Sequence, residues 1–389
     1  MTDQTQPPAS AERLPVSVLT GFLGSGKTTL LSKLLRHPGM ARTAVIINEF
    51  GEIGLDDALV EKAEGDTVLL SSGCLCCTIK SDLSEAMRSL YLKRVKGEVP
   101  EFQRIVIETT GLADPAPILH TLMADPLIAA RFRLDSVVTT VDAVHGMSQL
   151  DKQFESVKQA AVADRIVLTK TDLAKASDVQ ALRDRLKAIN PAAPLFSAVL
   201  GEIDPDNLFD AGLYDPRKKS ADVVRWLNEE AYHSTPVMGD HHHHDHKHDH
   251  DHDHDHDHNH DHHDHRGQDR HNVNRHDDHI RAFCLTFDEP LKWGALAQAL
   301  DLLVQFHGDK LLRVKGLLNL VESDKPVVIH GVQSMFHPPG TLPAWPSADQ
   351  RSRLVFITRD MEEQDVRGIL RSFLSFGEVT QPDGTAKNS

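Results

Sequence analysis

The sequence has no long hydrophobic segment and few cysteines. No apolar run approaches the ~20 residues of a membrane-spanning helix, so we expect a soluble protein with no membrane partner. Residues 1–13 are polar, contain Pro7-Pro8 and lack an apolar signal segment, which predicts a disordered N-terminus and a cytoplasmic location. The chain has only 4 cysteines in 389 residues, and three of them are clustered. This pattern argues against a secreted disulfide framework and for reduced thiols.

Basic residues are fewer than acidic residues in this chain. The formal net charge is −15, from 42 Lys+Arg against 57 Asp+Glu, so we expect no nucleic-acid partner. Much of this acidity comes from one tract, residues 240–279, whose core at 241–265 contains 15 His and 8 Asp. A segment of that composition cannot form a packed core and is expected to be disordered.

The tract is a candidate metal-binding segment, because its many imidazoles bind borderline metals. Its first candidate ligands are His241, His242, His243 and His244. Imidazole affinity rises from Co²⁺ to Ni²⁺ to Cu²⁺, with Zn²⁺ below Cu²⁺, and this general order does not identify the physiological metal. The alternative is a solvated linker with incidental histidines.

A phosphate-binding loop is the first motif of the chain. Residues 21–28 read GFLGSGKT, a full match to G-x-x-x-x-G-K-[ST], and they follow an apolar strand-like run from Leu14 to Leu19. Leucines at helical spacing follow, so the phosphates would meet a helix N-terminus. The candidate phosphate-binding residues are Gly21, Gly24, Ser25, Gly26, Lys27, Thr28 and Thr29.

Two further segments fit the same kind of site. The apolar run 104–107 ends in Glu108-Thr-Thr-Gly111, so Glu108 and the Thr28 hydroxyl are candidate Mg²⁺ ligands, and the Gly111 amide is placed to sense a γ-phosphate. Lys27 and Glu108 are the candidate catalytic residues. Residues 169–172, TKTD, resemble the guanine-reading N-K-x-D motif, with Thr169 in place of Asn.

The guanine-reading motif has a direct physical basis. The Asp172 carboxylate could accept hydrogen bonds from the N1–H and N2–H₂ groups of guanine, whereas adenine presents an acceptor there. Lys170 and Asp172 are therefore candidate nucleotide-binding residues.

Three thiols lie within four residues at Gly73-Cys-Leu-Cys-Cys77. Cys74, Cys76 and Cys77 suit Zn²⁺ or a similar cation but rarely complete a tetrahedron alone, which leaves a position for Glu49, a His, water or a ligand from another protein. The alternative, three buried apolar thiols, is improbable at this spacing. The fourth cysteine, Cys284, lies in an alternating strand and is expected in the core.

The pattern of elements predicts two folded domains. Strands alternating with amphipathic helices predict an α/β domain at 14–213, with a mostly parallel sheet flanked by helices. Residues 214–239 read as a helical connector and 240–279 as the His/Asp tract. Residues 280–376 predict a smaller α+β domain, followed by a disordered tail at 377–389.

The ordered motifs GFLGSGKTTL, NEFGEIG, GCLCC, ETTGLADP and TKTD resemble the CobW-type metallochaperone GTPases, relatives of the urease and hydrogenase nickel-insertion GTPases. The resemblance implies a P-loop GTPase that uses GTP and Mg²⁺. It also implies Zn²⁺, or Co²⁺ or Ni²⁺, held at the C-x-C-C motif, and transfer to a client metalloprotein coupled to GTP hydrolysis. Homodimers are common among such relatives. A cobalt factor for cobalamin synthesis and a His-rich metal store remain alternatives.

Overall fold

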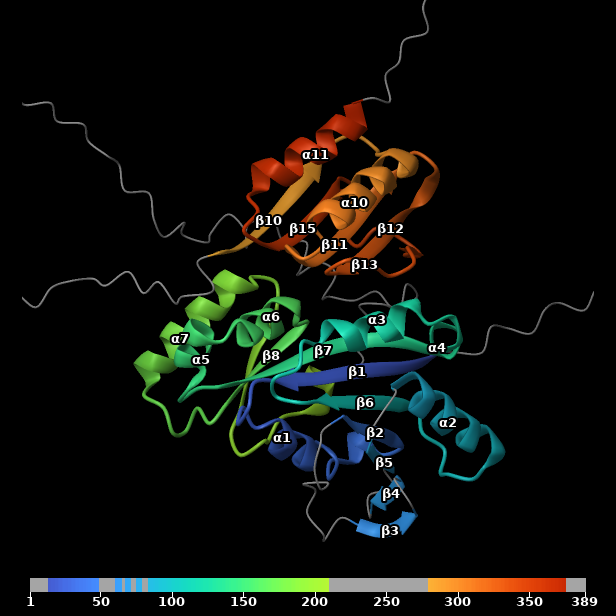
Figure 1. Ribbon diagram of the computed structural model, residues 1–389, viewed down its shortest axis with the longest axis vertical. Coiled ribbons are helices and arrows are strands. Elements are labelled where there is room, and N and C mark those ends of the chain that lie inside the picture. The colour runs from blue at the N-terminus through green and yellow to red at the C-terminus, as the bar shows by residue number, and fades with distance from the viewer. Residues whose placement is uncertain are drawn as a thin grey trace, which may run out of the picture.

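The described part of the chain forms two folded units (Figure 1). The structure, a computed structural model, describes residues 13–48, 60–64, 67–70, 75–78, 83–209 and 279–375. The expected connector at 214–239, most of the His/Asp tract and the tail after residue 376 lie outside the described residues. No helix in the described part of the chain has the length and apolar character needed to cross a membrane.

The N-terminal unit is built on one large sheet. Its strands lie in the order β3-β4-β5-β2-β6-β1-β7-β8-β9, and those from β5 to β9 in this order run parallel, whereas β3 and β4 are antiparallel additions at one edge. The strands are β1 (Leu14–Gly21), β2 (Thr43–Asn48), β3 (Val60–Glu64), β4 (Thr67–Leu70), β5 (Leu75–Thr78), β6 (Arg104–Thr109), β7 (Phe132–Asp142), β8 (Arg165–Thr169) and β9 (Leu195–Ala198).

Helices cover both faces of this sheet, which is why its central strands are continuously apolar. One face is covered by α1 (Lys27–Leu34), whose leucines pack with Leu19 and Val106. The opposite face carries α2 (Leu83–Lys96), α3 (Ala116–Ala124), α4 (Pro126–Arg131), α6 (Phe154–Val162) and α7 (Ala176–Ile189), with α5 (Gly146–Lys152) beside α6. The predicted parallel sheet flanked by helices is confirmed.

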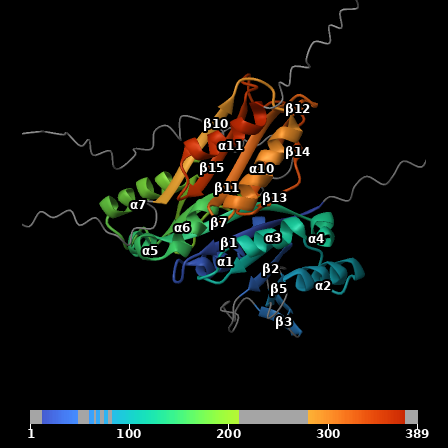
Figure 2. The same ribbon diagram turned by 45° about the horizontal axis from the view of Figure 1, so that its top comes forward.

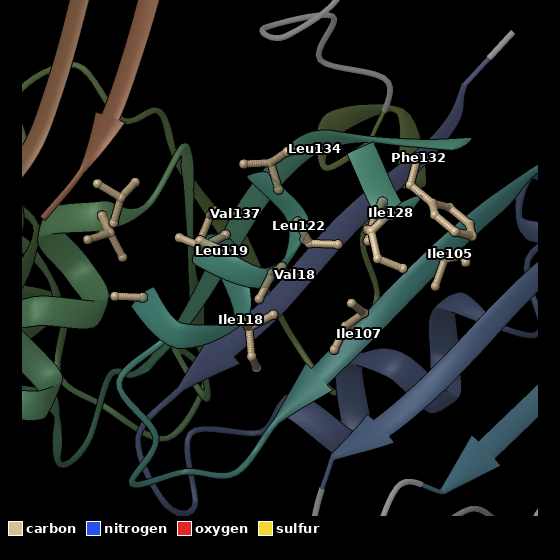
Figure 3. Packing of buried hydrophobic residues seen from close by; sticks show 14 of the residues in the cluster. Val18, Ile105, Ile107, Ile118, Leu119, Leu122, Ile128, Phe132, Leu134 and Val137 are labelled. Carbon is tan, nitrogen blue, oxygen red and sulfur yellow. The ribbon is translucent and has the colours of Figure 1, made fainter. Parts of the chain in front are cut away.

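Figure 3 shows the core on the second face. Val18 of β1 and Ile107 of β6 lie beneath the side chains of α3, and their sequence neighbours Leu19 and Val106 belong to the cluster on the other face. This alternation follows from the period of two in a β-strand. The labelled members of the cluster are Val18, Ile105, Ile107, Ile118, Leu119, Leu122, Ile128, Phe132, Leu134 and Val137.

The C-terminal unit is an antiparallel sheet with helices on one face. The strand order is β10-β15-β11-β12-β13, and β14 also pairs with β12. Its elements are β10 (Ile280–Phe287), α10 (Trp293–His307), β11 (Leu311–Leu320), β12 (Ser323–Val332), β13 (Met335–Phe336), β14 (Gly340–Thr341), β15 (Ser352–Arg359) and α11 (Glu363–Ser375). The expected smaller α+β fold is confirmed, and Cys284 is a buried core residue, as predicted.

One face of the C-terminal sheet is covered by α10 and α11. The opposite face packs on α3 and α6 of the N-terminal unit (Figure 2). Val332 and Val355 belong to the same apolar cluster as Leu119 of α3. A register shift in β11 between Leu311 and Arg313 turns Leu312 and Arg313 toward the same side, where Leu312 joins the cluster around α6. The two units therefore share continuous hydrophobic cores.

A buried ionic cluster lies within this interface. The Asp164 carboxylate, fully buried just after α6, pairs with the guanidinium of Arg313 and lies 2.7 Å from Lys315 Nζ. It also accepts a hydrogen bond from Val137 N at 3.0 Å. Burial alone would raise the pKa of Asp164, but the charges of Arg313 and Lys315 outweigh burial and hold that pKa well below its ordinary value.

We expect Asp164→Asn to destabilise the protein by about 3–5 kcal/mol, because two buried cations lose the carboxylate that compensates them. Urea unfolding at neutral pH would measure this. The matched control is Glu202→Gln, which breaks the exposed Lys33–Glu202 ion pair and should leave the unfolding midpoint unchanged.

The pH dependence of the same variant tests the sign of the interaction. The native pKa of Asp164 is depressed. Its ion pairs therefore contribute their full amount to the free energy of unfolding above the unfolded-state pKa of about 3.9, and this contribution is lost as the pH falls below that value. The wild type should lose stability in acid more steeply than Asp164→Asn. Equal acid sensitivity of the two proteins would contradict this assignment.

Candidate functional site

The phosphate-binding loop lies between the end of β1 and the start of α1. A Cβ at Gly21 would lie 2.3 Å from Thr140 Oγ1 and 2.4 Å from Thr140 O, and its φ of +143° disfavours other residues. Lys27 is the first residue of α1, and its Nζ donates to Gly21 O at 2.8 Å and Phe22 O at 3.3 Å. The Lys27 ammonium therefore lies against the loop backbone, where it can form an ion pair with a bound phosphate.

Thr28 and Glu108 are brought together as the sequence predicts. Thr28 follows Lys27 in α1, and Glu108 ends up beside it because β6 pairs with β1 and places Glu108 opposite Leu19. Thr28 Oγ1 donates to Glu108 Oε1 at 2.9 Å, and Glu108 is 1% exposed. A hydroxyl and a carboxylate at the edge of a phosphate loop form an oxygen donor set that fits Mg²⁺.

The TKTD segment follows β8 and contacts the phosphate loop directly. Thr169 Oγ1 donates to Ser25 O at 2.8 Å. Lys170 Nζ donates to Gly24 O at 2.8 Å and to Asp142 Oδ2 at 2.8 Å. Asp172 is exposed at the end of the same segment. The threonine in the place of the usual asparagine therefore still ties the segment to the loop.

Asp142 is a site residue that sequence reasoning did not assign. It ends the buried strand β7, is 1% exposed, and accepts hydrogen bonds at Oδ1 from Val144 N and His145 N. Its other oxygen binds Lys170, so Asp142 positions that lysine on the phosphate loop. The available signal was an acidic residue closing a buried strand beside the strand that ends in Thr169.

The loop after β6 presses against the phosphate loop. A Cβ at Gly111 would lie 2.6 Å from Leu23 Cδ2, 2.7 Å from Leu23 N and 2.8 Å from Leu23 Cα. From the other side, Gln159 of α6 donates from Nε2 to Gly111 O at 3.3 Å and Ala113 O at 3.1 Å. Gly111 is therefore held between the phosphate loop and α6, and Gln159 is a second residue that the sequence did not reveal.

The predicted transferred-metal site falls mostly outside the described residues, as Glu49, Cys74 and the histidines from His241 to His244 all do. Cys76 and Cys77 lie on β5, where the parallel register pairs them with Val45 and Ile46 of β2. Among the residues searched in the described part of the chain, no three His, Cys, Asp or Glu residues form a metal-binding group. The C-x-C-C metal site stays a prediction.

The fold and the site define a P-loop nucleotide-binding protein with an attached antiparallel α+β domain. Residues 15–197 match the CobW/HypB/UreG nucleotide-binding domain, and residues 280–374 match the cobalamin synthesis protein cobW C-terminal domain.

Known proteins agree with this classification. The chain is 31% identical over 354 residues to the zinc chaperone YjiA of Escherichia coli K12, covering 91% of this chain and 96% of that one. It is 36% identical over 203 residues to the zinc-regulated GTPase metalloprotein activator 1 of Schizosaccharomyces pombe, about half of each chain (50% and 48%). The Zn(II)-bound YjiA GTPase structure from E. coli matches with a TM-score of 0.65 at 30% identity, covering 93% of this chain and 99% of that one. The chain belongs to the CobW/HypB/UreG family, as its motifs indicated.

The close approach at Gly111 predicts a stability effect. Gly111→Ala would place a methyl group against backbone atoms of Leu23, so the loop must move, at a cost of about 1–3 kcal/mol. Gly368→Ala is the matched control, since Gly368 is in the interior of α11 and a Cβ there meets nothing within 4 Å. That control should stabilise the protein by about 0.5–1 kcal/mol. Thermal unfolding of both variants measures these changes in stability. A Gly111→Ala variant with the wild-type Tm would contradict the close packing of Gly111 on Leu23.

Proposed function

We propose that this protein is a GTP-hydrolysing zinc metallochaperone that transfers its metal to a client metalloprotein. The observation that carries the GTPase activity is the hydrogen bond of 2.9 Å between Thr28 and Glu108 at the phosphate loop, the same loop whose Gly21 carbonyl accepts from the Lys27 ammonium. The zinc-chaperone function is supported by the relationship to YjiA, which extends over 96% of that protein.

The nucleotide and its Mg²⁺ are held by the residues at the carboxyl end of the sheet. Backbone amides of the loop from Gly21 to Thr29 bind the phosphates, together with the Lys27 ammonium. Thr28 and Glu108 are the oxygen donors for Mg²⁺, which when bound neutralises charge on the phosphates. Gly111, pressed on Leu23, is the loop residue that contacts a γ-phosphate.

Guanine is read by the segment after β8. Lys170 is fixed by Asp142 and by Gly24 O, which leaves Asp172 as the exposed acceptor for the base. The carboxylate accepts from both N–H groups of guanine, and an adenine in the same place leaves it facing another acceptor.

The metal is cargo, and Cys74, Cys76 and Cys77 bind it, with Glu49 as the fourth ligand. We propose Zn²⁺ as the physiological metal, since thiolates suit it, and Co²⁺ or Ni²⁺ as alternatives. GTP orders the segment around Glu49 into a metal-holding geometry, and hydrolysis releases the metal, because γ-phosphate contacts stabilise one switch state. β5 supports this coupling, since it carries two of the cysteines in register with β2, the strand that leads to Glu49.

The His/Asp tract at 240–279 supplies metal to this site, with His241, His242, His243 and His244 at its start. Its 15 histidines in 25 residues favour a second candidate function, a metal store in which the tract does most of the work. Deleting 240–279 separates the two: a chaperone still activates its client, and a store does not. We place the protein in the cytoplasm, and we propose that it forms a homodimer.

The role of Asp172 predicts a change in base specificity. Asp172→Ala should weaken GDP binding by roughly 10–100-fold, the expected loss for hydrogen bonds to a charged acceptor. The wild type should prefer GDP over IDP, which lacks the N2 amino group, and the variant should lose most of that preference. Titration calorimetry with both nucleotides measures the ratio. Asp178→Ala, an exposed carboxylate on α7, is the control and should bind GDP as the wild type does.

The role of the thiols predicts nucleotide-dependent metal affinity. In protein lacking residues 240–279, a non-hydrolysable GTP analogue should tighten Zn²⁺ binding by at least about tenfold relative to GDP. The shift should disappear in Cys76→Ala and persist in Cys284→Ala, the buried cysteine of the C-terminal domain. Competition with a chromogenic chelator measures the affinities. If the nucleotide changed the Zn²⁺ affinity of Cys76→Ala by the same factor, the cysteine cluster would not be the nucleotide-controlled metal site.

A further inference from the structure

Asp114 receives hydrogen bonds from both domains. It follows the Gly111 loop and precedes α3, where its Oδ1 accepts from Ala116 N at 3.0 Å. Its Oδ2 accepts from Lys158 Nζ of α6 at 3.0 Å and from Gln333 Nε2 of the C-terminal domain, also at 3.0 Å. Burial works to raise the pKa of Asp114, but these three donors outweigh it and hold the pKa below its ordinary value. The carboxylate is therefore a charged acceptor shared between the domains.

The loop that Asp114 closes reaches the phosphate site within a few residues. Ala113 N bonds to Thr110 O at 3.1 Å, which makes residues 110–113 a tight turn. Gln159 holds the Gly111 and Ala113 carbonyls of this turn, and Gly111 lies directly on Leu23 of the phosphate loop. Asp114 and Gly111 therefore belong to one hydrogen-bonded segment that contacts the phosphate loop.

Gln333 adopts a backbone conformation that is unfavourable for its side chain. It lies in the short turn between β12 and β13 with φ of +51°, in the left-handed region where glycine is the unstrained residue. Strain of this kind persists where the surrounding structure imposes it and is concentrated at functional sites. Lys170, which binds the phosphate loop, has the same feature with φ of +56°, and so do Arg42, Leu200 and Asp360.

Stability of the domain interface does not explain the glutamine. The interface already contains two shared apolar clusters and the buried Asp164 cluster, and His120 of α3 contacts Val332 O at 3.1 Å beside the same turn. The hydrogen bond to this charged acceptor stabilises the interface, but the positive φ of Gln333 opposes it with a cost of the same order, so the net gain in stability is small. What the side chain gains in this conformation is its contact with Asp114.

We propose that Gln333 is a positioning residue for GTP hydrolysis, acting through Asp114 on the Gly111 loop. The C-terminal domain thereby contributes to the geometry of the GTPase site, and a displacement of that domain by a client would alter turnover. The inference rests on the proposed GTPase activity. It concerns the step in which Gly111 meets the γ-phosphate, so it affects GTP turnover and not GDP binding.

The test is Gln333→Gly, which removes the side chain and relieves the backbone at once. We expect kcat for GTP to fall about tenfold, the order expected when a small displacement misplaces a reacting group, with Kd for GDP unchanged. The Tm should stay equal or rise. A merely structural glutamine would give the opposite result, unchanged kcat with a lower Tm. Arg42→Gly is the matched control, because exposed Arg42 also has a positive φ of 59° but precedes β2; it should keep wild-type kcat.

A double-mutant cycle tests whether Gln333 acts on kcat through Asp114. Asp114→Asn should lower kcat by itself, and Gln333→Gly should then have no further effect, because its partner is already altered. Additive effects would show that Gln333 does not act through Asp114, and unchanged kcat in Gln333→Gly would overturn the proposal. In either case a hydrolysing wild type leaves the proposed function standing. A wild type with no GTP hydrolysis would overturn the proposed function and this inference together.

Discussion

Parallel strands end at the same edge of a sheet, and the chemistry of this protein depends on that constraint. β1, β6, β7 and β8 are neighbours in the sheet, although long stretches of sequence separate them. Their carboxyl ends carry the phosphate loop, Glu108, Asp142 and Thr169, which meet through hydrogen bonds of about 2.8–2.9 Å. Ligands of open α/β sheets bind at this edge for the same reason. The β-branched and leucine side chains that fill both faces hold these ends in place.

A buried charge lies in the interface between the two domains, beside the apolar clusters that they share. Asp164 lies between Arg313 and Lys315, and the cost of burying such charges offsets much of the gain from their mutual attraction. Apolar side chains would bind the domains without that cost. The ion pairs instead tie Asp164 of the first domain to β11 of the second, and the same interface brings Gln333 to Asp114. The same interface therefore contains both the buried ion pairs and the hydrogen bond to the residue that follows the Gly111 loop.

Much of this protein was predictable from its sequence because its motifs are local. The phosphate loop, the strand before Glu108 and the TKTD segment each occupy a few consecutive residues, and the alternation of strands and helices predicts a parallel sheet. Cys284 was correctly expected in the core from its alternating strand. Asp142, Gln159 and Gln333 were not found, because each acts on a segment far away in the chain. A polar residue in a helix or a hairpin turn looks like any solvent-facing residue until the fold gives it a partner.

The sequence by itself determined which chemical groups are available, since a glycine-rich loop, an acidic strand end and a thiol cluster need only their own neighbours to be recognised. It also determined the order of elements, through the periods of two and 3.6. The tertiary structure alone decided which of these groups meet. Thr28 reaches Glu108 across 80 positions, and Gln333 reaches Asp114 across 219. Contacts at such separations depend on strand order, on the bulge in β11 and on the packing of one domain against the other, and no local pattern records them.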